Sequence, residues 1–493
     1  MVHKTRLYNW YICLVAAGCM VLMGYDASVF NGIQNSDNSH AYFDNPDSYM
    51  LGLMNTVYTI GGILTGWFLA VPLADYMGRR WAMGIGCFYT IIATLMQCFP
   101  PANNAVPVFM AGRVLIGCGQ AFAIVRQLIS AAAGPIYIGD VTPSYIRGLV
   151  MAFWQMFYSV GSFVAYWVNY AAGKHADTLG GWDWKMVVIF QVLLPAIIIC
   201  QLPFMPESPR WFVQRKRDIE GARKVLQQVR DTDEEIENEL ATIREAIQYE
   251  REALDSGKKA YMTLLKDASA RKRLLLTFGL NIGKQLTGQG TFNSYSSTIY
   301  KKVWTNGDTI NLINALSATF GILFTLNAAW TVDRFGRKFL LIIGATGMAV
   351  CMLITALVGL ETPETPEAAK TEPVVWIYTA EVFPMNVRVQ AVGMCSQMQG
   401  VANTIFQQFF PIFYEKEGLK SFFFFMACNA LLAVFVWFLI PETKKVPLEE
   451  IDTLFGGTSH VQRGAAMLHE QKLELEHVEQ ARGGKEDSEH AVT

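Results

Sequence analysis

Long apolar runs separated by short polar stretches dominate the chain. A run of about 20 residues crosses the hydrocarbon core of a bilayer as a helix. On this criterion the sequence predicts spans over residues 9–31, 50–73, 82–99, 107–133, 149–172 and 186–205, and then over 274–300, 310–332, 339–360, 391–413 and 421–440. We therefore expect an all-α membrane protein with about eleven full spans.

Two polar segments depart from this pattern. Residues 207–273 interleave acidic and basic side chains with apolar residues at helical spacing, which is typical of amphipathic helices at a membrane surface. Residues 457–493 are polar and lack periodicity, which favours a disordered cytoplasmic tail. The expected organisation is an N-terminal bundle over 1–206, the amphipathic insert, a C-terminal bundle over 274–456, and the tail.

One short polar motif occurs once in each half of the chain. The first copy runs from Asp75 to Arg80 as DYMGRR, and the second runs from Asp333 to Lys338 as DRFGRK. In both copies a glycine permits a tight turn, and paired cations keep the loop out of the bilayer. The repetition indicates duplicated halves, which is the usual build of secondary transporters.

Composition and charge agree with a membrane protein and limit its partners. Of 493 residues, 52% are hydrophobic and 17% are charged, and the net charge of −2 suggests no nucleic-acid partner. The nine cysteines lie in apolar runs without a CxxC pair, so we expect no metal site and no cofactor. In the first half the cations fall on one side, which predicts a cytoplasmic N-terminus; they are Lys4, Arg6, Arg79, Arg80 and Arg147.

Further motifs resemble the sugar-porter branch of the major facilitator superfamily. They are Gly112-Arg113, the run PIYIGD at 135–140, PESPR at 206–210 and PETK at 441–444. Together with the two glycine loops, they extend the resemblance over residues 8–456, and the last motif resembles that of fungal hexose permeases. The resemblance implies two six-helix bundles in the plasma membrane, with alternating access to a central sugar site.

The same resemblance implies a charged network that controls the conformational cycle. In the family, the glycine loops and the PESPR and PETK segments lock the outward-facing state. The matching positions in this chain are Asp75, Gly78, Arg79, Arg80, Asp140, Arg147, Glu207, Arg210, Asp333, Gly336, Arg337, Glu381, Arg388 and Glu442.

Amide side chains inside the spans are the candidate sugar ligands. A sugar is a ring of hydroxyls, which side chains that both donate and accept hydrogen bonds suit best. The candidates are Gln155, Gln285, Gln289, Asn293, Gln399 and Asn403. By resemblance, Gln155, Gln285 and Gln399 match positions that bind the sugar, whereas Gly290 and Gly321 replace polar family residues. The alternative is that these amides bond one helix to another.

A carboxylate lies within the first span. Asp26 is costly to ionise in the bilayer unless it has a partner, and Arg113 at the start of span four is the candidate partner. Proton-coupled members of the family carry Asp and Arg at these positions. The hypothesis is that protonation of Asp26 releases an ion pair with Arg113 and lets the bundles rock. The alternative is a static ion pair that fixes helix packing.

Two regions depart from the family spacing. From Arg113 to Pro135 the chain is about seven residues too long, or two helical turns, and the excess carries Arg126. After span nine, residues 361–373 are polar and only 374–383 are apolar, which covers about half of the bilayer core. We interpret helix ten of the fold as mostly missing and attribute both departures to exon-boundary errors. A genuine shortened isoform is the alternative.

The leading hypothesis is therefore a proton-coupled monosaccharide importer acting as a monomer. Its partners are a sugar, a proton and the lipid bilayer. A facilitative sugar uniporter, a transporter-like nutrient sensor and an inactive isoform are the alternatives. No catalytic motif supports an enzyme.

Overall fold

The computed structural model describes residues 2–70, 73, 76–124, 144–216, 218–230, 232–255, 268–301, 304, 306–335, 337–361 and 388–441. Over these ranges the chain is helical and contains no strand. Several predictions from the sequence lie outside them: the extra residues near Arg126, the apolar remnant of helix ten and the C-terminal tail. The same holds for the gating candidates Asp75, Asp140, Gly336, Glu381 and Glu442.

The N-terminal half contains helices at all six expected spans. The first five are α1 (Val2–Ile33), α3 (Ser48–Thr65, continued by a π-helical turn over Gly66–Ala70), α5 (Arg79–Cys98), α6 (Ala105–Ile124) and α8 (Ser144–Lys174). Helix α1 packs along α8, and α6 packs between α3 and α5. Short helices cover the loops: α2 (Asp37–Tyr42), a 3-10 turn over Ala102–Asn104 and α9 (Ala176–Leu179).

The sixth span is helical but segmented. It consists of α10 (Asp183–Ile189), the 3-10 turn η4 (Phe190–Val192), α11 (Leu193–Gln201) and the 3-10 turn η5 (Leu202–Phe204). Pro195 has no backbone N–H, so it cannot donate a helical hydrogen bond to the carbonyl of Gln191, four residues earlier. This missing bond explains why the chain forms a tighter 3-10 turn around Gln191. The segmentation matters because it sets the position of the Gln191 side chain.

The C-terminal half begins with a span that the sequence predicted as one helix over 274–300. The structure corrects this prediction by dividing the span into α16 (Ala268–Leu286) and α17 (Gln289–Tyr300). Gly288, between them, has a φ of +83°, a left-handed conformation that favours glycine. A β-carbon at Gly288 would lie 2.6 Å from Cδ1 of Phe425, so the break is also where two helices approach closely.

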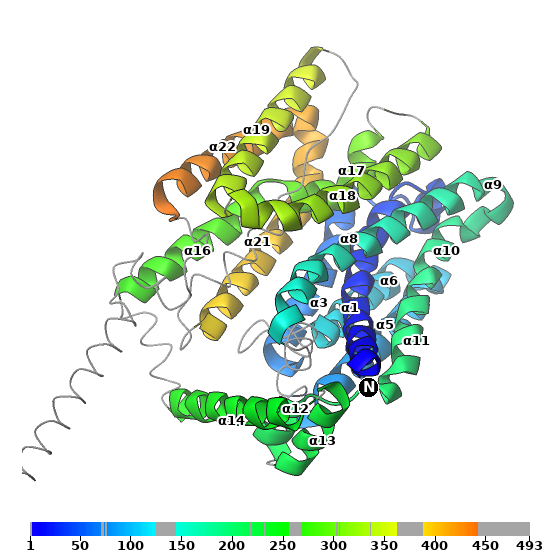
Figure 1. Ribbon diagram of the computed structural model, residues 1–493. Coiled ribbons are helices and arrows are strands. Elements are labelled where there is room, and N and C mark those ends of the chain that lie inside the picture. The colour runs from blue at the N-terminus through cyan, green and yellow to red at the C-terminus, as the bar shows by residue number, and fades with distance from the viewer. Residues whose placement is uncertain are drawn as a thin grey trace, which may run out of the picture.

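In the described part of this half, four further helices lie at the expected spans. They are α18 (Gly307–Phe335), α19 (Arg337–Glu361), α21 (Arg388–Glu417) and α22 (Ser421–Leu439). In Figure 1 they lie to one side of the N-terminal half, and α17, α18 and α21 contact α1, α8 and α3 respectively.

The charged insert forms helices, as its periodicity predicts. They are α12 (Pro209–Trp211), a π-helical turn over Phe212–Lys216, α13 (Ile219–Val229) and α14 (Asp233–Asp255). Their apolar faces pack on the N-terminal half around Ile12 and Met83. Asn9 donates a hydrogen bond to the carbonyl of Val229 (3.0 Å), and Arg230 binds Glu239 through two nitrogens. The insert is therefore docked at the N-terminal end of α1, as Figure 1 shows.

Six stretches within the described ranges are long and apolar enough to cross a membrane. They are Tyr8–Ile33, Arg79–Cys98, Ala102–Phe122, Ala176–Phe204, Lys338–Leu357 and Gln399–Leu439, the last of which contains two helices. The remaining expected spans also form helices, but they carry more polar side chains. Those polar positions include the candidate sugar amides Gln155, Gln285, Gln289 and Asn293.

Candidate functional site

Asp26 lies in the middle of the N-terminal half and is completely buried. Nε2 of Gln120, on α6, donates to Oδ2 of Asp26 at 2.6 Å. Nε2 of Gln191, in the 3-10 turn of the sixth span, donates to Oδ1 at 2.7 Å. Both carboxylate oxygens therefore accept a hydrogen bond from a neutral amide. Such bonds favour the ionised carboxylate without placing a second charge in the core.

Arg113 is also buried, with 1% of its surface exposed. Its guanidinium donates to Oδ1 of Asn55 (3.0 Å) and to the carbonyl of Met54 (3.4 Å), both on α3. It also lies 4.9 Å from the ring centroids of Phe30 and Tyr58, a distance suited to cation–π attraction. The cation is thus held by carbonyl oxygens and aromatic faces.

The structure corrects the expected direct ion pair between Asp26 and Arg113. Both residues are described, and no contact within 4 Å joins the carboxylate to the guanidinium. Instead, the Tyr58 hydroxyl donates to Oε1 of Gln120, whose amide nitrogen binds Asp26. The two charges are therefore linked through Tyr58 and Gln120. The sequence reasoning missed both glutamines, although each is a polar residue inside an apolar run.

The candidate sugar amides of the second half gather where α16, α17 and α21 meet. Gln285 and Gln289 are buried on either side of the break in span seven, and α16 packs against α21, which carries Asn403. A β-carbon at Gly290 would lie 3.3 Å from both Oδ1 of Asn403 and Oε1 of Gln285. Gly290 therefore faces the two amides, and its missing side chain leaves room between them.

The other three candidates are Gln399, Asn293 and Gln155. Oε1 of Gln399 is buried and has no hydrogen-bond partner among the residues described, so it is an acceptor available to a hydroxyl of a substrate. Asn293 is partly buried, and its carbonyl accepts from the Tyr166 hydroxyl across the interface between the halves. The side chain of Gln155 lies outside the described residues, although its backbone is part of α8.

Lys284 was not among the sequence candidates, yet it is buried, with 8% of its surface exposed, and it directly precedes Gln285 in the chain. An ionisable side chain inside a membrane span carries a large desolvation cost, so it is a functional candidate by default. Its signal in the sequence was the single cation inside an apolar run.

Neutral polar side chains join the two halves at the end of α1 opposite the insert. Asn31 donates to Oγ of Ser296 (2.5 Å) and accepts from the backbone of Ser297 (2.9 Å). Asn35 donates to Oδ1 of Asn311 (2.8 Å), which also accepts from Asn169 (2.8 Å). We call these five residues, with Ser297, the amide latch. No part of it was predicted from the sequence.

A second contact between the halves lies along α3 and α21. Gly52 on α3 lies so close to α21 that a β-carbon at this position would be 2.6 Å from the backbone oxygen of Gln408. Thr59 contacts Gln407 through a hydrogen bond of 3.3 Å. The two halves are therefore packed backbone against backbone at Gly52, where even the β-carbon of alanine would overlap α21.

Among the gating candidates, Glu207 caps the beginning of α5. Its carboxylate accepts from the backbone N–H groups of Arg79 (2.9 Å) and Arg80 (3.2 Å), where the helix dipole also favours a negative charge. Burial raises the pKa of the Glu207 carboxyl, and the N–H donors partly offset this effect. Arg79 donates to Oγ of Ser208 (3.0 Å), and Arg80 to the carbonyl of Met205 (2.7 Å). Arg210 belongs to the same segment.

Gly78 is held against this cap with a φ of +100°, and a β-carbon there would overlap Oε2 of Glu207. We expect Gly78→Ala to cost about 1–3 kcal/mol through backbone strain alone and to lower the apparent melting temperature in detergent. Gly347→Ala is the matched control, because a β-carbon at Gly347 meets nothing within 4 Å. Equal melting temperatures for the two variants would contradict the capping role.

The other gating candidates cannot be positioned at the level of side chains. Arg147, Asp333, Arg337 and Arg388 lie in helices, but their side chains are outside the described part of the chain. The charged network therefore stays a prediction beyond the contacts of Glu207, Arg79 and Arg80.

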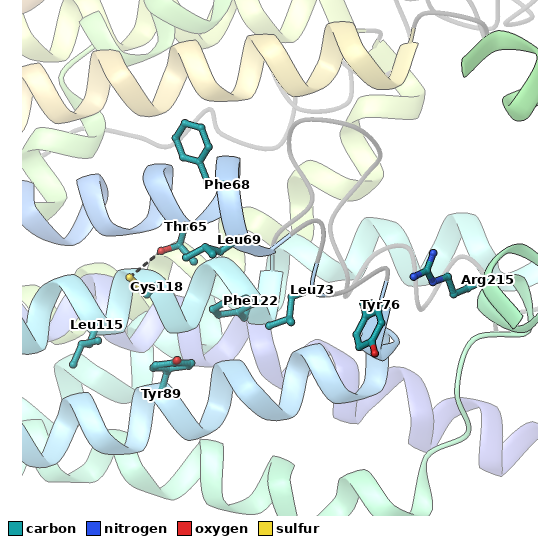
Figure 2. A pocket seen from close by; sticks show the side chains of 10 residues that line it. All are labelled: Thr65, Phe68, Leu69, Leu73, Tyr76, Tyr89, Leu115, Cys118, Phe122 and Arg215. Carbon is teal, nitrogen blue, oxygen red and sulfur yellow. Dashed lines mark hydrogen bonds between the residues drawn. The ribbon is translucent and has the colours of Figure 1, made fainter. Parts of the chain in front are cut away.

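An apolar cavity of about 830 Å³ lies outside this set of polar residues. Figure 2 shows it between α3, α5 and α6, where Phe68, Leu69, Phe122 and Tyr89 line it and Arg215 stands at one edge. Inside, Thr65 donates to Sγ of Cys118 at 2.9 Å. None of the candidate sugar amides lines this cavity, and its wall offers few groups to bind hydroxyls.

Comparison with known proteins identifies the family. The family model described as "Sugar (and other) transporter" matches residues 12–371 and, in a second piece, 368–455. A probable quinate permease of Aspergillus niger is 26% identical over 502 residues, which cover 91% of this chain and 89% of that protein. The D-xylose-proton symporter of Escherichia coli K12 is 28% identical over 488 residues, covering 91% and 96%.

Solved structures of the xylose transporter XylE share the fold. Its inward-open conformation aligns with a TM-score of 0.73 at 24% identity, covering 90% of this chain and 99% of XylE. The proton:xylose symporter bound to 6-bromo-6-deoxy-D-glucose aligns with a TM-score of 0.70 at 25% identity, covering 92% and 100%. The chain therefore belongs to the sugar transporter family of the major facilitator superfamily and is a multi-pass membrane protein.

Proposed function

We propose that this protein is a secondary transporter that moves a monosaccharide together with a proton by alternating access. The observation that carries this proposal is the buried Asp26. Both of its carboxylate oxygens accept hydrogen bonds from amides, and Arg113 is linked to it only through Tyr58 and Gln120. A buried carboxylate without a direct countercharge can gain a proton at moderate cost. Asp26 is the proton carrier in this account, and Arg113 biases its charge.

The substrate site is assigned to the amides of the second half. Gln285, Gln289, Gln399 and Asn403 are neutral groups that donate and accept, which suits a ring of hydroxyls. Gln155 and Asn293 are assigned to the same site from opposite sides of the interface. The open acceptor of Gln399 supports this assignment, because a sugar hydroxyl would give it the partner it lacks.

The contacts between the halves support an inference about the conformational state. They close the end of α1 that lies opposite the insert. We infer that the insert and the N-terminus are cytoplasmic, that the structure is inward-facing, and that the protein acts as a monomer in the plasma membrane. The charged loops at the cytoplasmic side would then meet only in the outward-facing state.

The truncation of helix ten remains part of the proposal. The family model matches this chain in two pieces that meet at 368–371, within the stretch that lacks a full span. This break supports a lost segment at that joint. Sequencing the transcript across residues 361–388 and 124–131 tests it, since an unaltered message would exclude a gene-structure error.

Uptake by the purified protein in sealed lipid vesicles tests the function. With an inward proton gradient, we expect saturable accumulation of one labelled monosaccharide among D-xylose, D-glucose and D-fructose, and loss of accumulation when a protonophore is added. Uptake that equilibrates regardless of the protonophore would indicate a facilitative uniporter. Absence of uptake for every substrate tested, by this chain and by a version with helix ten restored, would overturn the proposal.

A polyhydroxylated carboxylic acid is the second candidate substrate. Two observations favour it: Lys284, a buried cation that directly precedes Gln285 in the chain, and the relatives described as probable quinate permeases. An ammonium group attracts a carboxylate in a site of low dielectric constant. We expect Lys284→Met to abolish quinate uptake selectively if the substrate is an acid, and to leave the affinity ranking of neutral sugars unchanged. Equal loss for both classes would argue for a structural role.

A further inference from the structure

Asp26 is bound by two glutamines that are not equivalent. Gln120 uses both ends of its amide, since its nitrogen binds Asp26 while its oxygen accepts from Tyr58. Gln191 uses only its nitrogen: its oxygen Oε1 is buried and has no partner among the described residues. One amide is therefore bound at both its nitrogen and its oxygen, and the other at its nitrogen alone.

The protonation state of Asp26 determines which end of Gln191 fits. A carboxylate only accepts hydrogen bonds, so both glutamines must present their nitrogens to it. A carboxylic acid carries one O–H donor, which cannot face an amide N–H. When Asp26 gains a proton on Oδ1 and the new O–H points at Gln191, two donors oppose each other, and rotation of the amide brings Oε1 into place as an acceptor.

The ionisable groups around Asp26 cannot substitute for this response. They are Tyr25 on the same helix, Tyr58 on α3, Cys87 on α5 and Arg113 on α6. No ionisable side chain among the described residues of α8 or the sixth span belongs to this set. Arg113 makes no direct contact with the carboxylate, so the groups touching Asp26 are the two amides.

We propose that Gln191 is a positioning residue that reads the protonation state of Asp26 by rotating its side-chain amide, and so couples the proton to the segmented sixth span. The inference rests on the proposed proton symport. It assigns a role to the 3-10 turn over Phe190–Val192, which aims Gln191 at the carboxylate. Proton binding to Asp26 on α1 thereby changes its contact with Gln191 in the sixth span, in addition to its contact with Gln120 on α6.

The test is the pH profile of substrate uptake by Gln191→Met in lipid vesicles. Methionine has a similar length but cannot donate to the carboxylate, so ionised Asp26 loses one of its two donors. We expect the pH midpoint of uptake to rise by about one to two units, which corresponds to one hydrogen bond to a charged group. The maximal rate at low pH should change less than the midpoint.

Gln97→Met is the matched control. Gln97 is on α5 in the same half, is completely buried, and neither amide atom has a partner in the described structure. The same substitution there removes the same amide without touching Asp26, so the midpoint should equal that of the wild type. If Gln191→Met does not fold, Gln191→Glu keeps the size and polarity. It should also raise the midpoint, because two carboxyl groups would share one proton.

The possible outcomes distinguish the role of Gln191 from the proposed proton symport. If Asp26→Asn removes the pH dependence while Gln191→Met and Gln191→Glu keep the wild-type midpoint, the role of Gln191 is wrong and proton symport stands. If the wild type shows no pH dependence at all, both are wrong. A similar shift in Gln97→Met and Gln191→Met would also overturn the inference, since it would indicate a general packing effect.

Discussion

Asp26→Asn is expected to abolish uphill accumulation of substrate and to preserve exchange of substrate across the membrane. The substitution removes the group that gains and loses the proton, but it keeps the size of the side chain. The new amide is accommodated because Oε1 of Gln191 has no other partner among the described residues and can accept from it. Uptake under an inward proton gradient should therefore stop at equal concentrations inside and outside.

Counterflow in vesicles preloaded with unlabelled substrate is the control for this variant. It needs the conformational cycle but no net movement of protons, so we expect a rate close to that of the wild type. Persistent accumulation above the external concentration would show that Asp26 is not the proton carrier. Loss of both accumulation and counterflow would instead support the static packing role for this residue.

Gly52→Ala is expected to open the contact between the two halves. A β-carbon at this position would lie 2.6 Å from a backbone oxygen of α21, which cannot move as a side-chain end can. Overpacking of this kind costs about 1–3 kcal/mol, and that energy shifts a two-state equilibrium roughly 5- to 150-fold. The variant should therefore disfavour the closed arrangement of α3 and α21 and slow counterflow.

Spin labels at Ala41 and Lys416, both exposed, would report the separation of the halves at this end. We expect Gly52→Ala to increase the population with the longer distance in a background without native cysteines. Gly62→Ala on the same helix is the matched control, because its β-carbon would lie 3.5 Å from Gly117, an ordinary contact within the first half. Identical distance distributions in the two variants would contradict the proposed closure.

The sequence predicts the helices well because length and hydropathy determine which segments can span a bilayer. The ranges 82–99 and 421–440, for example, correspond closely to α5 and α22. It does not predict the break at Gly288 within 274–300, because the run stays apolar enough for one helix and the break depends on contact with Phe425. Tertiary contact decided that case.

The sequence predicts which residue types belong to the candidate site, but it does not predict which residues form hydrogen bonds with one another. Asp26 and Arg113 stand out as charges in apolar runs, yet the hydrogen bonds from Gln120 and Gln191 depend on three different helices meeting. The amide latch depends in the same way on α1 meeting α17 and α18. Such pairings join residues more than 90 positions apart, which local sequence patterns do not encode.

Substrate-driven proton movement in sealed vesicles tests the central claim most directly. With no imposed gradient and a pH-sensitive dye inside, adding the transported substrate outside should acidify the lumen in the wild type. The same addition should leave the luminal pH unchanged in Asp26→Asn, although substrate enters. Entry of substrate into wild-type vesicles without any change of pH would contradict the account.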